Sequence, residues 1–504
     1  MMTPDKKISQ DAHVPQVKRS RKPAKAGSKV TAGDPTKIQT YGHENDEAVF
    51  IRKKQLFGTN GVRGIIGKDM TPELVLRIGE ALGTMRQGCI AVGMDTRTSG
   101  DTLAGAIKSG LLATGCDVVD CGILPTPALQ YIVREHYDGG AMITASHNPP
   151  EYNGVKIIEP DGTEMGDDET IQLEQLIIGR TFPVKSWDQV GREITAPHAV
   201  DEYVHAIASQ FPERPGDKMT VVVDPGSGPA CQTTPRILSA MGCRVLTING
   251  IMDGTFPGRL PEPSPDGLRG LSALVTASGA AFGVAHDGDA DRAVFVDETG
   301  QFVEENQEFA LVAQYICQRS KGTLVTPVST SQMIEMVANK AGCDVVYTQV
   351  GSIYVARKMR ELITANKTVV FGGEGNGGLI FPDHQFCRDG GMTAAMMVAI
   401  LASSHKPLSS LVRGLPRRIM KKEKISTPDG LQVIRQLSKK YSHEQVDRTD
   451  GLKIRRGNTW ALVRASGTEP LIRIMVDAVD ITQADEFFRE LKGYVSSAIT
   501  QMSK

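Results

Sequence analysis

Several classes of protein are excluded by what this 504-residue sequence lacks. It contains no apolar run near the ~18 residues that a transmembrane helix needs, so we expect no membrane span. Positive charge is not in excess, because 57 Lys and Arg stand against 58 Asp and Glu, which argues against a protein that binds nucleic acid by bulk charge. The eight cysteines form no CxxC pair, which predicts reduced, mostly buried thiols in the cytoplasm rather than a structural zinc site.

The N-terminal segment also lacks what folding needs. Its first 33 residues contain eight Lys or Arg, two acidic residues, no Leu and no aromatic residue. Such a composition cannot bury enough apolar surface to become ordered, so residues 1–47 are predicted to be a disordered basic tail. An apolar h-region is missing, which excludes a secretory signal. We favour a plain disordered extension, and the alternative is an arm that contacts nucleic acid or a membrane.

Three segments of the body share one pattern: an apolar run, a loop of small residues, a helix-like stretch, then Gly-Cys and a second apolar run. The copies begin at IAVGMDT (90–96), VVVDPGSGPA (221–230) and TLVTPVST (323–330). Each copy predicts a strand–helix–strand unit of a parallel sheet, with a glycine ending the helix. The expected helices span about 103–113, 234–241 and 333–340, and the glycines are Gly115, Gly242 and Gly342.

The composition changes after residue 415. The KKEK run (421–424) is predicted to be a solvated linker, and two strands (459–465 and 470–478) and a helix (about 482–499) are expected to follow. The fold class is therefore α/β, with three related mixed α/β domains and a smaller α+β C-terminal domain. The predicted domains are 48–200, 201–305, 306–415 and 416–504.

The segment TASHNPP (144–150) is the first that indicates chemistry. An apolar stretch precedes it and its proline pair prevents a helix, so Ser146 is expected on an exposed loop at a strand end. A serine beside His147 is also typical of a hydrolase nucleophile, although G-x-S-x-G is missing. An ordinary turn with local caps is the alternative.

The second segment, DGDADR (287–292), has three carboxylates within five residues. They repel one another unless a hard cation lies among them, and Mg²⁺ fits because it leaves room for a phosphate oxygen. An EF-hand is disfavoured, because Arg292 stands where the loop requires glycine. Asp287, Asp289 and Asp291 are therefore candidate Mg²⁺ ligands, with a metal-free acidic turn as the alternative.

Three further loops are weaker signals one by one. RASGTEP (464–470), followed by Arg473, has the glycine, hydroxyls and arginine of an anion cradle. GGEGNGG (372–378) allows a ligand close to its backbone, and Glu374 and Asn376 offer hydrogen bonds to sugar hydroxyls. FGTNGVRG (57–64) presents Arg63 on a glycine-flanked turn.

Together, these five segments resemble the α-D-phosphohexomutase superfamily, which includes phosphoglucomutases, phosphomannomutases and phosphoglucosamine mutases. The match spans about residues 50–480 in the family's order, and FGTNGVRG and GGEGNGGLIFP look most like the archaeal branch of phosphoglucosamine mutases. The resemblance implies four domains around a central cleft.

It also implies a role for each loop. Ser146 resembles the family's phosphoserine, which together with Asp287, Asp289 and Asp291 contacts Mg²⁺. Lys156 resembles the acid/base lysine, His147 would support the same loop, and Arg63 and Arg292 would lie beside the transferring phosphate. The implied substrate-binding residues are Glu374 and Asn376 for the sugar, and Arg464, Ser466, Gly467, Thr468 and Arg473 for the other phosphate.

The implied reaction interconverts the 6-phospho and 1-phospho forms of a hexosamine or hexose, preferably glucosamine, with a sugar 1,6-bisphosphate as activator. A phosphoglucomutase/phosphomannomutase of the same mechanism, a Mg²⁺-dependent sugar phosphatase and a non-catalytic sensor stay open as alternatives. The expected partner is a small sugar phosphate, with no membrane or nucleic acid, and the chain is expected to be a cytoplasmic monomer or homodimer.

Two departures from the family pattern concern the sugar. Many relatives read Gly-Glu-x-Ser-Gly-His in the sugar loop, whereas this chain has Asn376 at the Ser place and Gly378 at the His place. His384 lies six residues further on and is a weak candidate for that histidine's role. Where relatives often have Gly-Asp-Arg, this chain has Gly-Ser-Ile (351–353). The identity of the sugar is therefore open.

Overall fold

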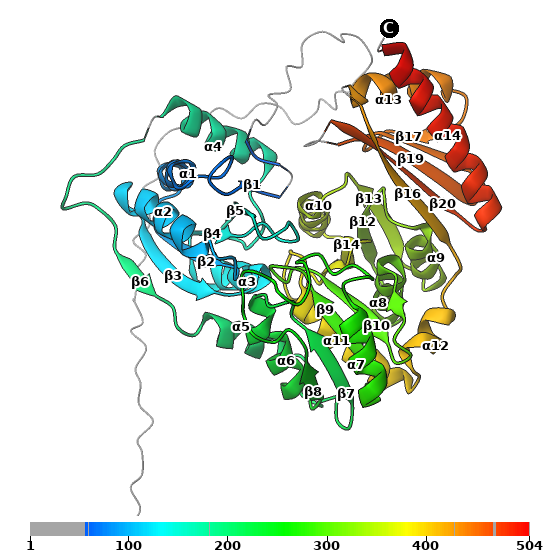
Figure 1. The fold of residues 1–504 in the computed structure, drawn as a ribbon, viewed down its shortest axis with the longest axis horizontal. Coiled ribbons are helices and arrows are strands. Elements are labelled where there is room, and N and C mark those ends of the chain that lie inside the picture. The colour runs from blue at the N-terminus through cyan, green and yellow to red at the C-terminus, as the bar shows by residue number, and fades with distance from the viewer. Residues whose placement is uncertain (1–55, 59, 181, 428, 467–469, 503–504) are drawn as a thin grey trace, which may run out of the picture. The chain divides into compact units, whose positions relative to one another are not determined.

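A computed structural model of the chain describes residues 56–58, 60–180, 182–427, 429–466 and 470–502. These residues form four sheets that follow one another along the chain, with helices packed against them (Figure 1). The four sheets fall one each within the four predicted segments, whose exact boundaries stay predictions. The predicted basic tail, residues 1–47, lies outside the described residues.

The first sheet has six strands, of which the last four in its spatial order run parallel. One layer of helices, α1 (Pro72–Met85), α2 (Gly100–Ala113) and α4 (Asp167–Gly179), covers one face, and α3 (Thr126–His136) packs on the other. The spatial order is β1 (Val62–Ile65), β5 (Tyr152–Ile158), β4 (Gly139–Ile143), β2 (Cys89–Met94), β3 (Asp117–Ile123), β6 (Glu193–Thr195).

The second sheet has five strands and again combines a parallel part with antiparallel strands at one edge. Its order is β11 (Phe302–Val303), β10 (Ala293–Asp297), β9 (Phe282–His286), β7 (Thr220–Asp224), β8 (Arg244–Thr247). Its helices are α5 (Ala199–Ala208), the 3-10 helix η1 (Pro229–Gln232), α6 (Thr234–Ala240) and α7 (Arg269–Ser278).

The third sheet has four strands, in the order β13 (Asp344–Thr348), β12 (Thr323–Pro327), β14 (Val369–Glu374), β15 (Gly378–Ile380). Its helices are α8 (Glu305–Arg319), α9 (Gln332–Lys340), α10 (Ser352–Thr364), α11 (Gly390–Ser404) and α12 (Leu408–Arg413). Helix α11 is buried almost throughout because it packs against elements of both the second and the third sheet.

The fourth sheet is antiparallel and more extensive than the two strands that the sequence predicts. Its order is β16 (Ile419–Ser426), β20 (Leu471–Ala478), β19 (Thr459–Ala465), β18 (Leu452–Arg456), β17 (Gln445–Asp447), and its helices are α13 (Gly430–Lys440) and α14 (Ile481–Met502). The prediction of a solvated linker at 421–424 is wrong: the run lies in edge strand β16, where lysines face solvent while the backbone pairs with β20.

The three predicted strand–helix–strand units are confirmed. Their strands pair in parallel as β2 with β3, β7 with β8, and β12 with β13. The connecting helices are α2, α6 and α9. The glycines after these helices all have positive φ, at +87° for Gly115, +98° for Gly242 and +76° for Gly342. This left-handed conformation costs a glycine little, which explains the residue type at the helix end.

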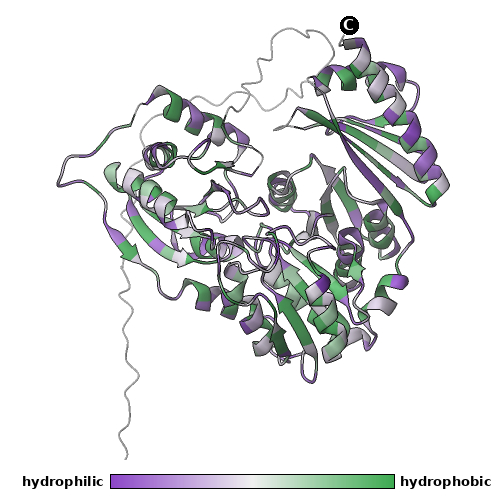
Figure 2. Ribbon diagram, in the orientation of Figure 1, coloured by the Kyte–Doolittle hydropathy of each residue, from purple (hydrophilic) through white to green (hydrophobic). Residues whose placement is uncertain are grey.

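The buried side chains show how the sheets are joined. One continuous hydrophobic cluster contains residues of the first three sheets, such as Met142, Val223 and Phe371, so these sheets share a core. The fourth sheet has its own core under α14, which carries both apolar and polar residues, whereas β7 is apolar in its middle (Figure 2). No helix among the described residues is long and apolar enough to cross a membrane.

Candidate active site

The serine loop after β4 is fixed by one buried arginine. Arg97 pairs with Asp95 over 3.1 Å, and its Nη2 donates to the carbonyl oxygens of Ser146 at 2.7 Å and Asn148 at 2.6 Å. The Nη1 atom donates to two further carbonyls, of Pro149 and Tyr152. A guanidinium that donates to four carbonyls fixes the path of a loop with no regular backbone pairing. Sequence reasoning missed Arg97, although two charged residues directly after an apolar strand are a usable signal.

Ser146 is fully buried, so the expectation of an exposed loop is wrong. The metal loop of the second sheet covers it: a Cβ atom on Gly288 would lie 2.3 Å from the Ser146 carbonyl oxygen. Ser146 also has a left-handed backbone, with φ at +50°, which costs a non-glycine residue about 1–2 kcal/mol. Strain of this kind persists where surrounding contacts fix it, and it is common at functional sites.

The three aspartates of the metal loop lie directly against Ser146. The Ser146 hydroxyl donates to Oδ2 of Asp287 over 2.8 Å. Ligand atoms of Asp287, Asp289 and Asp291 all lie within 4.8 Å of one another, and all three side chains are buried. Thr126, at the start of α3, anchors this loop by donating its hydroxyl to Asp289 Oδ2 over 2.6 Å. The predicted serine and aspartates therefore form one cluster.

The electrostatics of the aspartates fit a cation. Burial and the charges of Asp291 and Asp289 raise the pKa of Asp287 to about 8. The Oδ1 atoms of Asp289 and Asp291 are buried without a hydrogen-bond partner. Unpartnered carboxylate oxygens in a buried site carry a desolvation cost, which a hard divalent cation with oxygen ligands relieves. The residues present therefore fit the predicted metal.

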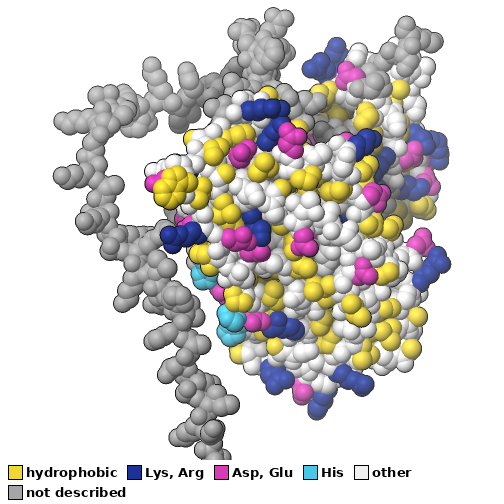
Figure 3. Space-filling view, turned by 60° about the vertical axis from the view of Figure 1, so that its left-hand side comes forward, with side chains coloured by type: hydrophobic (Ala, Val, Ile, Leu, Met, Phe, Trp, Pro, Cys, Tyr) yellow, Lys and Arg dark blue, Asp and Glu magenta, His cyan; other side chains and the backbone are white. Residues whose placement is uncertain are grey.

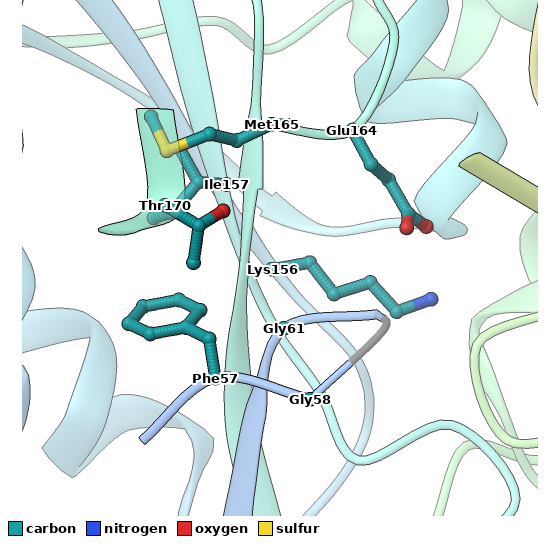
Figure 4. A pocket seen from close by; sticks show the side chains of 8 residues that line it. All are labelled: Phe57, Gly58, Gly61, Lys156, Ile157, Glu164, Met165 and Thr170. Carbon is teal, nitrogen blue, oxygen red and sulfur yellow. The ribbon is translucent and has the colours of Figure 1, made fainter. Parts of the chain in front are cut away.

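Lys156, on β5, lies beside the same aspartates. Its Nζ donates to Asp289 over 2.7 Å and to Asp291 over 3.0 Å. Burial opposes its charge, but these two carboxylates raise the pKa of Lys156 above its ordinary range. Figure 4 shows the side chains of Lys156 and Glu164 extending to the same side of a small cavity. Glu164, which sequence reasoning missed, adds a further carboxylate facing this lysine.

His147 and the two predicted arginines complete this cluster. The Nδ1 atom of His147 lies 3.1 Å from Arg292 Nη2 and 3.5 Å from the Ser146 hydroxyl. Burial, together with Arg292 and Arg63, lowers the pKa of His147 to about 3, so the ring is neutral at pH 7. Arg63 lies on strand β1 and not on the predicted turn, and it donates to the Asn148 side chain of the serine loop over 3.1 Å. The predicted catalytic residues are therefore brought together.

The sugar loop reaches this cluster through an arginine that the sequence reasoning did not select. Arg388 donates through Nη2 to Asp291 over 2.5 Å and through Nη1 to Glu374 over 3.2 Å. Asn376 accepts from the backbone N–H of Gly378 and thereby shapes its own loop. The charged pair Arg388–Asp389 before Gly390-Gly391 was the signal that could have found this residue.

His384, the weak candidate for the missing histidine's role, lies away from the residues of the sugar loop. It is buried, stacks on Tyr131 at 5.4 Å between ring centroids, and lies 3.3 Å from Asp389 and 3.1 Å from Gln210. These contacts place it in a polar network between α3, α5 and the start of α11, and none of them is with Glu374 or Asn376. The network explains the histidine without a role in sugar binding.

The phosphate loop of the fourth sheet is described only in part. Among the described residues, Arg464 pairs with Asp450 over 3.1 Å rather than with a member of the Ser146 cluster. Asp450 also accepts from the backbone N–H of Val350 in the third domain's turn. Arg464 and Arg473 are cross-strand neighbours on β19 and β20, and Ser466 closes the hairpin by donating its N–H to Leu471. Gly467 and Thr468 lie outside the described residues.

Comparisons with known proteins agree with this geometry. The description "Phosphoglucomutase/phosphomannomutase, alpha/beta/alpha domain" matches residues 54–183 as domain I, 201–300 as domain II and 304–419 as domain III. The C-terminal domain of the same family matches residues 417–492.

Curated relatives match the chain over most of its length. It is 43% identical over 447 residues to "Phosphoglucomutase/phosphomannomutase" of Thermococcus kodakarensis, covering 86% of this chain and 96% of the relative. It is 42% identical to "Probable phosphoglucosamine mutase" of Methanopyrus kandleri, with the same coverage. A solved structure of a phosphoglucomutase/phosphomannomutase family protein from Burkholderia thailandensis superposes with a TM-score of 0.78 at 27% identity, covering 87% of this chain and 97% of the other. The chain therefore belongs to the phosphoglucomutase/phosphomannomutase family, and is an enzyme of the phosphohexomutase type.

Proposed function

We propose that this enzyme interconverts glucosamine 6-phosphate and glucosamine 1-phosphate through a phosphoserine at Ser146 and a bisphosphorylated sugar. The observation that carries the proposal is the contact of the Ser146 hydroxyl with Asp287, beside the unpartnered Oδ1 atoms of Asp289 and Asp291. A serine hydroxyl next to a cation site, with arginines on two sides, suits phosphoryl transfer, which depends on positioning and charge neutralisation.

In the first step, the bond between phosphorus and the Ser146 oxygen breaks as a sugar hydroxyl oxygen bonds to phosphorus, and the hydroxyl proton ends on Ser146. The bisphosphate then turns over and returns its other phosphate to Ser146 by the reverse reaction. Mg²⁺ bound by Asp287, Asp289 and Asp291 would neutralise charge on the phosphate oxygens. Lys156 is held in its protonated form by two carboxylates, so its role is that of the acid and of a fixed positive charge.

The neutral ring of His147 orients Arg292, because its Nδ1 accepts from that guanidinium. Arg292 on the metal loop and Arg63 on β1 would then face the transferring phosphate. Glu374 and Asn376 would contact the sugar hydroxyls. The phosphate that is not transferring would bind Arg464, Ser466 and Arg473 together with Gly467 and Thr468, and this remote binding supplies energy away from the reacting centre.

A phosphoglucomutase/phosphomannomutase of the same mechanism is the second candidate, because a relative of that name is 43% identical.

The eight free cysteines support a reducing compartment such as the cytoplasm. The face in Figure 3 has Lys and Arg interspersed with Asp and Glu, which suits a small sugar phosphate as partner.

A turnover assay separates these candidates. The enzyme, primed with Mg²⁺ and glucose 1,6-bisphosphate, is given the 6-phosphates of glucosamine, glucose and mannose in parallel, and inorganic phosphate is measured in the same samples. We expect the highest kcat/KM with glucosamine 6-phosphate and little release of phosphate. A higher value with glucose or mannose identifies the second candidate. Steady release of phosphate without isomerisation contradicts a mutase and indicates a phosphatase.

A further inference from the structure

The structure shows what occupies the place of the missing sugar-loop histidine. A Cβ atom added to Gly378 would lie 2.3 Å from Cδ and 3.0 Å from Cγ of Arg388. Carbon atoms that are not bonded pack at about 3.5–4.0 Å, so a side chain at residue 378 and the present course of Arg388 exclude each other. The aliphatic part of Arg388 therefore lies where a histidine at residue 378 would begin.

The backbone fixes this arrangement. Arg388 forms an antiparallel bridge with Ile380, at the end of β15, and the next residue, Asp389, donates its N–H to Leu379 over 2.9 Å. The Asp389 side chain then accepts from the N–H of Met392 and caps α11. Because the segment before α11 runs alongside β15, the Arg388 side chain crosses Gly378 by virtue of the fold.

The guanidinium of Arg388 connects two parts of the site. It is 4% exposed, and it bridges Glu374 of the sugar loop and Asp291 of the metal loop. Burial works against its charge, but Asp291 and Glu374 raise the pKa of Arg388, so it is a cation at every working pH. A histidine at this place would be largely neutral near pH 7, and it lacks the second terminal nitrogen with which Arg388 reaches Asp291.

We propose that Arg388 is a positioning residue for sugar binding that replaces the sugar-loop histidine in both space and charge. Its guanidinium holds the Glu374 side chain oriented toward the sugar hydroxyls, and it links that side chain to the metal loop. The inference rests on the proposed function, which identifies the loop around Glu374 as the sugar site. It predicts that glycine at residue 378 and arginine at residue 388 are required together.

Four variants test this pairing: Arg388→Lys, Arg388→Ala, Gly378→His and the double variant Gly378→His/Arg388→Ala. We expect Arg388→Ala to raise KM for the sugar phosphate by about 10- to 100-fold with a smaller change in kcat, as for loss of a hydrogen bond to a charged group. Arg388→Lys keeps the charge, so its KM should lie between that of Arg388→Ala and that of the wild type. Gly378→His alone should lower the thermal midpoint, because it clashes with Arg388.

The double variant gives the decisive result. It should recover the thermal midpoint lost in Gly378→His and lower KM relative to Arg388→Ala, and its KM should become pH-dependent near the ordinary histidine pKa of about 6.5. Gly493→His, at an exposed position of α14 where an added Cβ meets no atom within 4 Å, is the matched control and should leave the midpoint unchanged.

The outcomes separate the two proposals. A wild-type enzyme that does not isomerise any of the three sugar phosphates overturns the proposed function, whatever the variants do. Two results would overturn only the role of Arg388, provided that the wild-type enzyme turns over. One is an Arg388→Ala variant with an unchanged KM. The other is a double variant that is no more stable than Gly378→His and has a KM no lower than that of Arg388→Ala.

Discussion

The Ser146 hydroxyl donates to Asp287 across the contact between the loops of the first and second sheets. The two residues are 141 positions apart in the sequence, and the shared core of the first three sheets keeps their loops together. Because the serine lies on a loop of one sheet and its aspartate partner on a loop of another, the candidate site depends on that packing.

Replacing Ser146 with alanine removes the oxygen that would carry the phosphate. We expect mutase turnover to fall by at least about 10³-fold, as for the loss of a nucleophile. Intact-mass measurement of the wild-type protein should give a fraction heavier by about 80 Da, the mass of one phosphate, which Ser146→Ala lacks. Ser278→Ala, on the exposed end of α7, should keep that fraction. Full turnover by Ser146→Ala would exclude this serine as the phosphate donor.

Asp289→Asn tests the cation site independently of turnover. Asp289 offers a buried, unpartnered Oδ1 atom and is one of the three carboxyl groups of the cluster, so the amide should weaken Mg²⁺ binding by about 10-fold or more. Calorimetric titration of Mg²⁺ into the metal-free protein measures this change. Asp266→Asn, an exposed residue outside the cluster, serves as the control. Equal Mg²⁺ affinity of Asp289→Asn and wild type would count against the aspartate cluster as the metal site.

Local sequence patterns were sufficient for much of the fold. The three strand–helix–strand units follow from apolar runs, helix-ending glycines and the β-branched strands after them, all of which are short-range signals. The lysine-rich strand β16 was missed because its charges face solvent at the edge of a sheet, where they resemble a linker.

The residues that hold the site together were not predictable in the same way. Arg97 binds a loop 49 residues further along, and Arg388 binds Asp291 from 97 residues away. Their partners are backbone carbonyls and carboxylates far away in the sequence, and no local pattern links those partners to the two arginines. The burial of Ser146 has the same origin, since it depends on the metal loop packing over it.

Arg464→Ala tests the remote phosphate site. Its guanidinium now pairs with Asp450 and would bind a phosphate through charge-assisted hydrogen bonds. We expect KM for a hexosamine or hexose monophosphate to rise about 10- to 100-fold, with a smaller change in kcat at saturation. Arg455→Ala, on neighbouring β18 and paired with Glu335, is the control. An unchanged KM in Arg464→Ala would remove this loop from the substrate site.

The contact between the third and fourth sheets contains a buried lysine. Lys453, on β18, is 1% exposed, and its Nζ donates to the carbonyl oxygen of Val328 over 2.6 Å. It lies 4.1 Å from the Trp460 ring and 4.9 Å from the Tyr347 ring. Burial lowers the pKa of Lys453 to about 7.

This lysine makes stability depend on pH. Below about pH 7 the amine is charged in the folded and the unfolded chain, so the cost of its burial is fully present. Between that pH and about 10.4 the unfolded chain holds more protons, and the free energy of unfolding rises with pH. Lys453→Met keeps the apolar packing and removes the charge. We therefore expect its free energy of unfolding to exceed that of the wild type by about 2–4 kcal/mol at pH 6, and by less as the pH approaches 10. Urea unfolding followed by tryptophan fluorescence measures this gap, and the variant Lys439→Met, at an exposed position, should show no gap. A gap that is absent, or equal at pH 6 and pH 10, would mean that Lys453 is not buried as a lysine of lowered pKa.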